Sequence, residues 1–308
     1  MAKRERNRLS DACCSVLDRL LFLVELVMEK AIRWMGPLYV ITATALVLTV
    51  AYVFFFILLV EMKHDSIRHH EGFHGCVGFF LLFNVLFNYL GCVFTKPGNT
   101  ATADQEVLNS SIMEHWRFCK KCNRPKPDLA HHCSICKSCV LRMDHHCPWV
   151  ANCVGFRNYR YFFLFLFYTT VGCGYACLMM VANSKRFMEG GDDQFLRMFA
   201  LVLSGAACLA VCGLLGWHFF LVLTGQGTID FYDNFSNWKE ARRLGRQWRN
   251  PFDQGAANNF KDVFDVDGRF WWILWLLPSW REKKGDGMRF KMDESRQRLK
   301  NKGQIGIV

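Results

Sequence analysis

The chain has 308 residues, of which 52% are hydrophobic, with 28 Phe, 10 Trp and a formal net charge of +11. This apolar content is unusual for a soluble enzyme. The Lys and Arg residues gather beside apolar blocks rather than in a base-reading stripe, which favours anionic lipid headgroups, or a phosphorylated cofactor, over nucleic acid as partners.

Four apolar blocks without an acidic or basic side chain predict four membrane-spanning helices. They cover residues 38–60, 75–94, 161–182 and 198–223. A hydrocarbon core of roughly 30 Å needs about 20 helical residues at about 1.5 Å per residue, and each block is long enough. We therefore predict an all-α integral membrane protein.

The segment before the first span, residues 1–37, does not resemble a cleaved signal peptide. Six charged side chains interrupt residues 16–34. Two interpretations stay open for this stretch. It could be an amphipathic helix on the membrane surface, or a helix that packs on the segment between the second and third spans.

The basic residues predict the orientation of the spans. Lys and Arg number seven before the first span, ten between the second and third, and sixteen after the fourth, but only two and three in the remaining loops. Because basic loops stay on the cytosolic side, segments 1–37, 95–160 and 224–308 are expected in the cytosol. The loops 61–74 and 183–197 are expected in the lumen.

Seven of the 15 cysteines lie in the predicted cytosolic segment 95–160. A reducing compartment disfavours disulfides, so metal binding is the stronger interpretation. From Cys119 the chain runs CKKC, nine residues, HCSICKSC, four residues, DHHC, five residues and Cys153. Six cysteines and two histidines would complete two closed zinc sites, each with three thiolates and one imidazole. One cysteine is then spare.

The spare thiol is of interest because closed metal sites do no chemistry. Cys147 adjoins two histidines and follows Asp144 by three residues, which are the residue types of a nucleophile, a base and a carboxylate that orients the base. The residues alone leave open whether Cys147 or Cys153 is the spare thiol. They also leave open whether Asp144 orients a base or a metal-bound histidine.

The run from Cys119 to Phe162 resembles the cysteine-rich domain of the DHHC protein S-acyltransferases. It keeps every ligand spacing of that family, and PW, Cys153, Asn158 and Phe162 follow at the expected places. The cysteine-rich segment between the second and third of four spans is also similar to the family layout. The resemblance implies an enzyme in which Cys147 takes a fatty acyl group, preferably palmitoyl, from acyl-CoA as a thioester. It then passes the group to a cysteine of a membrane-associated substrate protein.

The resemblance also implies a role for each of the other motif residues. His145 would be the base and Asp144 the residue that orients it. Two structural Zn²⁺ ions would be bound, one by Cys119, Cys122, His132 and Cys139, and the other by Cys133, Cys136, His146 and Cys153.

Two further elements resemble the family with departures. Residues 95–98, TKPG, are similar to its DPG element with Lys96 in place of Asp, and residues 227–230, GTID, to its TTxE element with Gly227 and Asp230 substituted. Thr228, Asp230 and Asn259 are expected to support the active site. The departures leave open an alternative function, a catalytically silent zinc-bearing scaffold.

Several residues are expected to surround the acyl chain. The resemblance makes Trp149, Phe162 and Phe165 walls of an acyl cavity. Gly172 lies on the same face of the third span, where the lack of a side chain would admit long chains. The alternative is that Gly172 and Gly174 only allow close helix packing.

The C-terminal region suggests a location. Residues 249–279 are most similar to the Abl-philin branch of the family, which implies the endoplasmic reticulum or Golgi. Residues 270–280, FWWILWLLPSW, are too short to span and are predicted to lie at the membrane boundary. Four arginines, Arg242, Arg243, Arg246 and Arg249, are expected to face lipid headgroups, with CoA phosphates as the alternative. His218, in the fourth span, is expected to be hydrogen-bonded between helices rather than to bind a ligand.

Overall fold

The computed structural model describes residues 2–63, 71–102, 116–184, 187 and 192–291. In this part of the chain four helices are long and apolar enough to cross a membrane. They are α1 (Ala2–Tyr52), continued by the π-helical turn η1 (Val53–Leu58) and by α2 (Leu59–Lys63), then α3 (Glu71–Phe94), α5 (Tyr159–Ala182) and α7 (Gln194–Leu223). The predicted fold class, a helical protein with four membrane spans, is confirmed.

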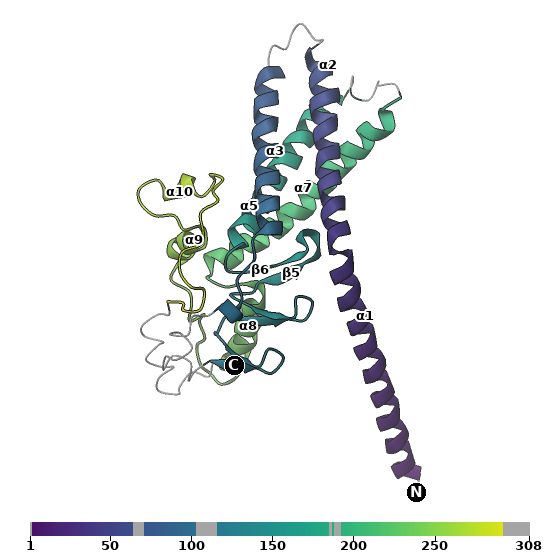
Figure 1. Ribbon diagram of the computed structural model, residues 1–308, viewed down its shortest axis with the longest axis vertical. Helices are drawn as coiled ribbons and strands as arrows, with labels where there is room; N and C mark the ends of the chain where they lie inside the picture. The colour runs from purple at the N-terminus through teal and green to yellow at the C-terminus, as the bar shows by residue number, and fades with distance from the viewer. Residues whose placement is uncertain (1, 64–70, 103–115, 185–186, 188–191, 292–308) are drawn as a thin grey trace.

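Helix α1 runs without interruption through Pro37 and extends far beyond the other helices (Figure 1). Residues 16–34 are therefore helical but continuous with the first span. This helix contacts the cysteine-rich segment. Glu29 forms a 2.9 Å ion pair with Lys137, and a Cβ at Gly36 would lie 3.0 Å from the Ala151 Cβ. Glycine thus allows the helix to approach that segment closely.

Helix α5 packs against both α3 and α7 (Figure 1). Where α3 ends and α5 begins, a Cβ at Gly91 would lie 2.8 Å from the Tyr161 ring, so the glycine is needed for this close approach. The π-helical turn η1 interrupts the regular helix and carries the buried Phe54. Such turns reorient the side chains that follow them. Here the ring of Phe54 packs toward Tyr175 of α5, with 5.9 Å between the ring centroids.

The cysteine-rich segment between α3 and α5 consists of three small antiparallel hairpins at one end of the helices (Figure 1). The short 3-10 helix η2 (Thr100–Thr102) precedes them in the chain, and η4 (Pro148–Val150) lies in the turn of the third hairpin. The hairpins pair β1 (Arg117–Cys119) with β2 (Arg124–Lys126), β3 (His131–Cys133) with β4 (Ser138–Val140), and β5 (His145–Cys147) with β6 (Asn152–Val154).

Two asparagines fasten the hairpins to the end of α3. The side-chain amide of Asn152 donates to the carbonyls of Cys92 and Thr95, at 3.1 and 2.9 Å. The amide of Asn158 donates to Thr95 and to Cys153, at 3.2 and 2.8 Å. The bonds to Cys92 and Thr95 occupy carbonyls at the end of α3, where a helix leaves them without partners. The third hairpin is thereby held against the membrane helices.

The chain after α7 forms α8 (Thr228–Arg243), α9 (Ala256–Phe264) and α10 (Trp271–Leu274). Residues 270–280 pack partly on this region, because Trp275 lies against Phe260 and Phe264. Trp280 contacts Phe87 of α3, with ring centroids 4.4 Å apart, yet it is 68% exposed. The segment therefore presents apolar side chains beside the ends of the spanning helices.

Candidate functional site

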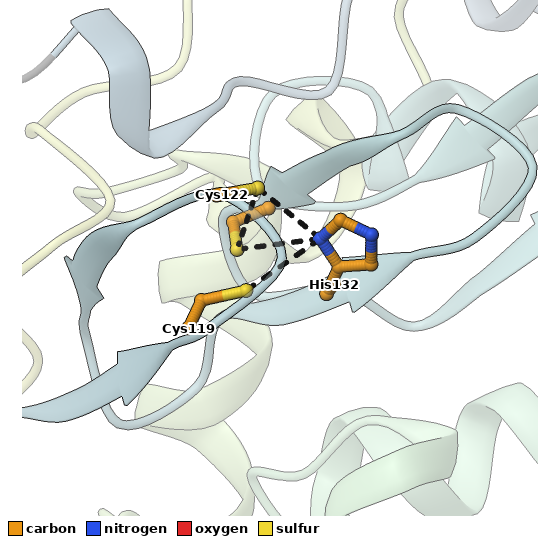
Figure 2. A group of neighbouring side chains, drawn as sticks. Cys119, Cys122 and His132 are labelled. Carbon is orange, nitrogen blue, oxygen red and sulfur yellow. Dashed lines mark hydrogen bonds between the residues drawn. The ribbon is translucent and has the colours of Figure 1, made fainter.

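The first two hairpins bring one group of cysteine and histidine side chains together. The register of β3 and β4 sets His132 opposite Cys139, and the turn of the first hairpin supplies Cys119 and Cys122. Figure 2 shows the cysteine sulfurs converging on the His132 ring. The Nδ1 atom of His132 lies 3.2 Å from the Cys122 Sγ and 3.6 Å from the Cys119 Sγ. The Sγ of Cys139 is 3.9 Å from the same nitrogen.

A second group repeats this construction one hairpin further along. His146 of β5 lies opposite Cys153 of β6, and the turn after β3 supplies Cys133 and Cys136. The Nδ1 atom of His146 lies 3.4, 3.5 and 3.7 Å from the sulfurs of Cys136, Cys153 and Cys133. Within each group, all four ligand atoms lie within 4.8 Å of one another.

Both groups fit a tetrahedral metal ion. Ligands at about 2.0–2.3 Å from such an ion lie about 3.5–3.8 Å from one another, close to the distances between the sulfurs and the imidazole nitrogens here. Three thiolates and one imidazole are a donor set that Zn²⁺ takes. Because each group joins two hairpins, bound ions would link all three hairpins into one unit.

The other face of β5 carries different chemistry. Side chains alternate across a strand, so His145 and Cys147 lie on the face opposite His146. The Nδ1 atom of His145 is 2.7 Å from the Oδ2 atom of Asp144. Cys147 is 8% exposed and Asp144 only 1%. A thiol, an imidazole and a carboxylate are therefore gathered in a nearly dry place beside the metal-type groups.

Asp144 and His145 each stabilise the charged form of the other. Burial alone would lower the pKa of His145, but hydrogen bonds with Asp144 and Cys147 outweigh it and raise this pKa to about 9. Burial alone would raise the pKa of Asp144, yet the hydrogen bond and charge of His145 lower it overall. The arrangement stabilises an ionised carboxylate next to a protonated imidazole.

An apolar cavity of about 620 Å³ opens on Cys147 and His145. It runs between α1, α3, α5 and α7 and reaches Tyr175 and Ala176 in the second half of α5. The four residues predicted as acyl-cavity positions all line it: Trp149, Phe162, Phe165 and Gly172. The cavity is sufficiently long and apolar to hold a hydrocarbon chain that starts at the thiol.

Comparison with known proteins identifies the family. The family model for DHHC palmitoyltransferases matches residues 112–234. Palmitoyltransferase ZDHHC16A of Danio rerio is 31% identical over 89% of this chain and 82% of its own length. The chain belongs to the DHHC palmitoyltransferase family. Probable protein S-acyltransferase 14 of Arabidopsis thaliana is 36% identical over 66% of this chain and 71% of its own. Palmitoyltransferase ZDHHC2 of Mus musculus is 34% identical over 62% and 50%.

The N-terminus of α8 forms hydrogen bonds with the carboxylate of the DHHC motif, Asp144. The backbone N–H of Thr228 donates to the Asp144 Oδ1 atom, and its hydroxyl donates to Oδ2, both at 2.9 Å. The helix N-terminus adds a favourable field for the negative charge. Thr228 therefore lies where the resemblance predicts support for the acidic residue.

Asp230 has a different position from Thr228. Its Oδ2 atom accepts the backbone N–H of Gly227 at 2.9 Å, which caps the first turn of α8. Its Oδ1 atom lies 3.9 Å from the Nε2 atom of His131 on β3. Asp230 thus holds the helix start near the second hairpin, and no hydrogen bond or ion pair joins it to Asp144 or His145.

Asn259, on α9, lies behind the turn that joins α7 to α8. Its amide donates to the Leu223 carbonyl at 2.9 Å, and its oxygen accepts the backbone N–H of Gln254, also at 2.9 Å. Gly225 in this turn has φ +66°, and a Cβ there would lie 3.0 Å from the Asn259 oxygen. Asn259 therefore contacts the backbone that leads to Thr228.

The element containing Lys96 contacts the hairpins through its backbone. Gly98, at φ +92°, accepts the Leu141 backbone N–H at 3.1 Å, and Pro97 accepts that of Arg157 at 3.1 Å. The side chain of Lys96 is exposed. The departure at this position therefore leaves the backbone contacts of the element in place.

Two further features border the site, one of them predicted from the sequence and the other not. The Nδ1 atom of His218 is 2.9 Å from the Tyr159 hydroxyl, which confirms the expected hydrogen bond between helices. The His218 ring also packs 5.0 Å from Phe162 and 6.1 Å from His145. The α1 side of the cavity was not predicted, although small and branched residues recur there at helical spacing: Ala43, Val47, Val50 and Ala51.

Proposed function

We propose that this chain is a membrane-embedded protein S-acyltransferase that moves a long-chain fatty acyl group, preferably palmitoyl, from acyl-CoA to cysteines of substrate proteins. The observation that carries the proposal is the apolar cavity that opens on Cys147, with His145 and Asp144 behind the thiol. A thioester formed on Cys147 would have its tail in the cavity and its carbonyl at the hairpins.

The proposed reaction has two steps. In the first, His145 takes the thiol proton, and the Cys147 sulfur attacks the acyl-CoA carbonyl. The carbon–sulfur bond to CoA breaks, and the CoA thiolate takes a proton from His145. In the second, His145 takes the proton from the thiol of a substrate protein, whose sulfur attacks the acyl-Cys147 carbonyl. The carbon–sulfur bond to Cys147 breaks, and the Cys147 thiolate takes the proton back from His145. Each step exchanges one thioester for another, so thiol activation and positioning are the main tasks of the enzyme.

The cavity accounts for the choice of a fatty substrate. Each buried CH₂ contributes about 0.8 kcal/mol, and a tail that enters from the membrane does not cross water. A Cβ at Gly172 would meet the nearest atoms of Leu81 and Val85 only at 3.9 Å, whereas one at Gly174 would lie 3.2 Å from the Cys208 sulfur. Gly174 therefore serves helix packing, while Gly172 leaves room for the chain. We propose that Gly172 admits long acyl chains.

We propose Zn²⁺ as the ion in both cysteine and histidine groups, with a structural role. The ligand sets are closed, so neither ion offers an open position for substrate. Ions at these positions would fix β5, and with it the direction in which His145 and Cys147 point.

We propose that the protein lies in the endoplasmic reticulum or Golgi membrane, with the hairpins and both chain ends on the cytosolic side. The distribution of basic residues supports this orientation, and the resemblance of the C-terminal region supports the address. Residues 270–280 would rest at the membrane boundary. Lipid headgroups would contact four exposed arginines, Arg242, Arg243, Arg246 and Arg249. Substrate proteins would be membrane-associated, with cytosolic cysteines.

The proposal is tested by incubating the purified, zinc-loaded protein with labelled palmitoyl-CoA. We expect a hydroxylamine-labile label on the wild type that passes to an acceptor thiol and is absent from Cys147→Ser. A folded, zinc-loaded wild type without any label would instead support the scaffold alternative.

A further inference from the structure

Thr169 places a polar group in the middle of the apolar cavity. It lies on α5, its side chain lines the cavity, and it is 8% exposed. Among the residues that the structure describes, its Oγ1 atom is one of the few buried polar atoms without a hydrogen-bond partner. Buried polar atoms are normally hydrogen-bonded, so this hydroxyl calls for a physical explanation.

Other threonines of the spanning helices form a hydrogen bond to their own helix backbone that Thr169 lacks. The hydroxyl of the adjacent Thr170 donates to the Leu166 carbonyl at 2.9 Å. Those of Thr44 and Thr49 donate in the same way to carbonyls four residues earlier, at 2.8 and 2.9 Å. This bond is the usual solution for a threonine in a helix. The Thr169 hydroxyl lacks it and remains able to donate to a group in the cavity.

The position of Thr169 along the cavity corresponds to the middle of a long acyl chain. Phe162 lies against His145, with ring centroids 5.0 Å apart, and so marks the level of the thiol. Thr169 follows seven residues later, which is about 10 Å along the helix. An extended chain of single bonds advances by about 1.25 Å per carbon, so Thr169 lies about eight carbons from the thioester. That is where an oleoyl chain has its double bond.

We propose that Thr169 favours long acyl chains with a cis double bond at mid-chain over saturated chains of equal length. Its hydroxyl would donate to the π electrons of the double bond, a weak but directional interaction in a dry cavity. The kinked chain also needs lateral room, which Gly172 provides one helical turn further along. This inference rests on the proposed function, because it describes the acyl chain bound at the same site.

The test measures chain binding separately from acyl transfer. Full-length, zinc-loaded Cys147→Ala protein in lipid nanodiscs binds a fluorescent long-chain acyl-CoA, and three competitors of equal length displace it: stearoyl-CoA, oleoyl-CoA and petroselinoyl-CoA, whose double bond lies closer to the thioester. Adding Thr169→Val, which has the same shape without the hydroxyl, is expected to lower the affinity ratio of oleoyl to stearoyl by about two- to five-fold. The ratio of petroselinoyl to stearoyl is expected to change less.

Thr170→Val is the matched control, because its hydroxyl is already bonded to the helix backbone and its side chain does not line the cavity. It is expected to leave both ratios unchanged. An unchanged oleoyl ratio in Thr169→Val, an equal fall for petroselinoyl, or no displacement of the probe by any chain would overturn the inference. Selective chain binding by a protein whose wild-type Cys147 never becomes acylated would refute the proposed function and leave this inference standing.

Discussion

The two faces of strand β5 surround two neighbouring histidines with different groups. On one face, His146 points its Nδ1 atom at three cysteine sulfurs, each within 3.7 Å. On the other, His145 points its Nδ1 atom at a buried carboxylate and shares a cavity with Cys147. Under the proposed function, one three-residue strand would separate metal binding from acyl transfer. Alternation along the strand, rather than residue type, would decide the role of each histidine.

The largest expected effect follows from removing the histidine on the metal face. His146→Ala should lose about one of two zinc ions per chain, because three thiolates remain to bind an ion that needs four ligands. Structural zinc contributes about 10 kcal/mol or more to folding, so the third hairpin should also lose its fold. Elemental analysis and thermal unfolding measure both losses. Retention of two ions would remove the distinction between the two faces.

Removing the histidine on the other face should affect chemistry more than the fold. His145→Ala should keep both ions and lower the unfolding temperature far less than His146→Ala, although Asp144 loses its imidazole partner. Acylation of Cys147 by palmitoyl-CoA should slow by about 10²- to 10⁴-fold, the usual contribution of a general base. Metal content and the acylation rate are measured on the same preparation. Loss of one ion in this variant would mean that the two histidines have been assigned the wrong way round.

A smaller effect is expected where α8 contacts the Asp144 carboxylate. Thr228→Val removes the hydroxyl bond to Oδ2 but keeps the backbone bond to Oδ1. Since hydrogen bonds to charged groups contribute about 1.5–3 kcal/mol, acylation should slow by about 10- to 150-fold if the whole contribution is lost in the transition state, with zinc content unchanged. Thr228→Ser keeps a hydroxyl and should recover most of the rate. Equal rates for the valine and serine variants would argue against a role for this bond.

The smallest effect is expected at the far part of the cavity. Gly172→Phe should fill the space beside Leu81 and Val85 and shift the preference from C18 and C16 toward C14 acyl-CoA, with the thiol chemistry intact. Competition among the three acyl-CoA substrates measures the shift. If the preference stays as in the wild type, Gly172 has a packing role only.

Much of the fold follows from patterns within short stretches. The four spans are continuous apolar blocks, and the ligand spacings carry the family resemblance. The continuity of α1 was harder to anticipate, because charged residues within 16–34 suggested a helix separate from the first span. The helix nevertheless continues, and it packs on Ala151 through Gly36. Such a contact joins residues far apart in the chain and leaves no local signal.

The site likewise combines residues that the sequence predicts with contacts that only tertiary packing decides. Spacing alone left Cys147 and Cys153 equivalent, whereas the register of β5 and β6 pairs Cys153 with His146 and leaves Cys147 facing the cavity. The contact between Thr228 and Asp144 spans 84 residues and depends on how α7 ends. The cavity walls from α1 depend on the rotation of that helix against its neighbours. These features come from tertiary packing, which periodicity does not encode.

The central claim is that Cys147 carries the acyl group while both metal groups remain complete. Native mass spectrometry of the wild type after incubation with palmitoyl-CoA tests it most directly. We predict a species that holds two zinc ions and one hydroxylamine-labile palmitoyl group, with peptide mapping to Cys147. An acyl group on Cys153, or acylation accompanied by the loss of one zinc ion, would contradict the account.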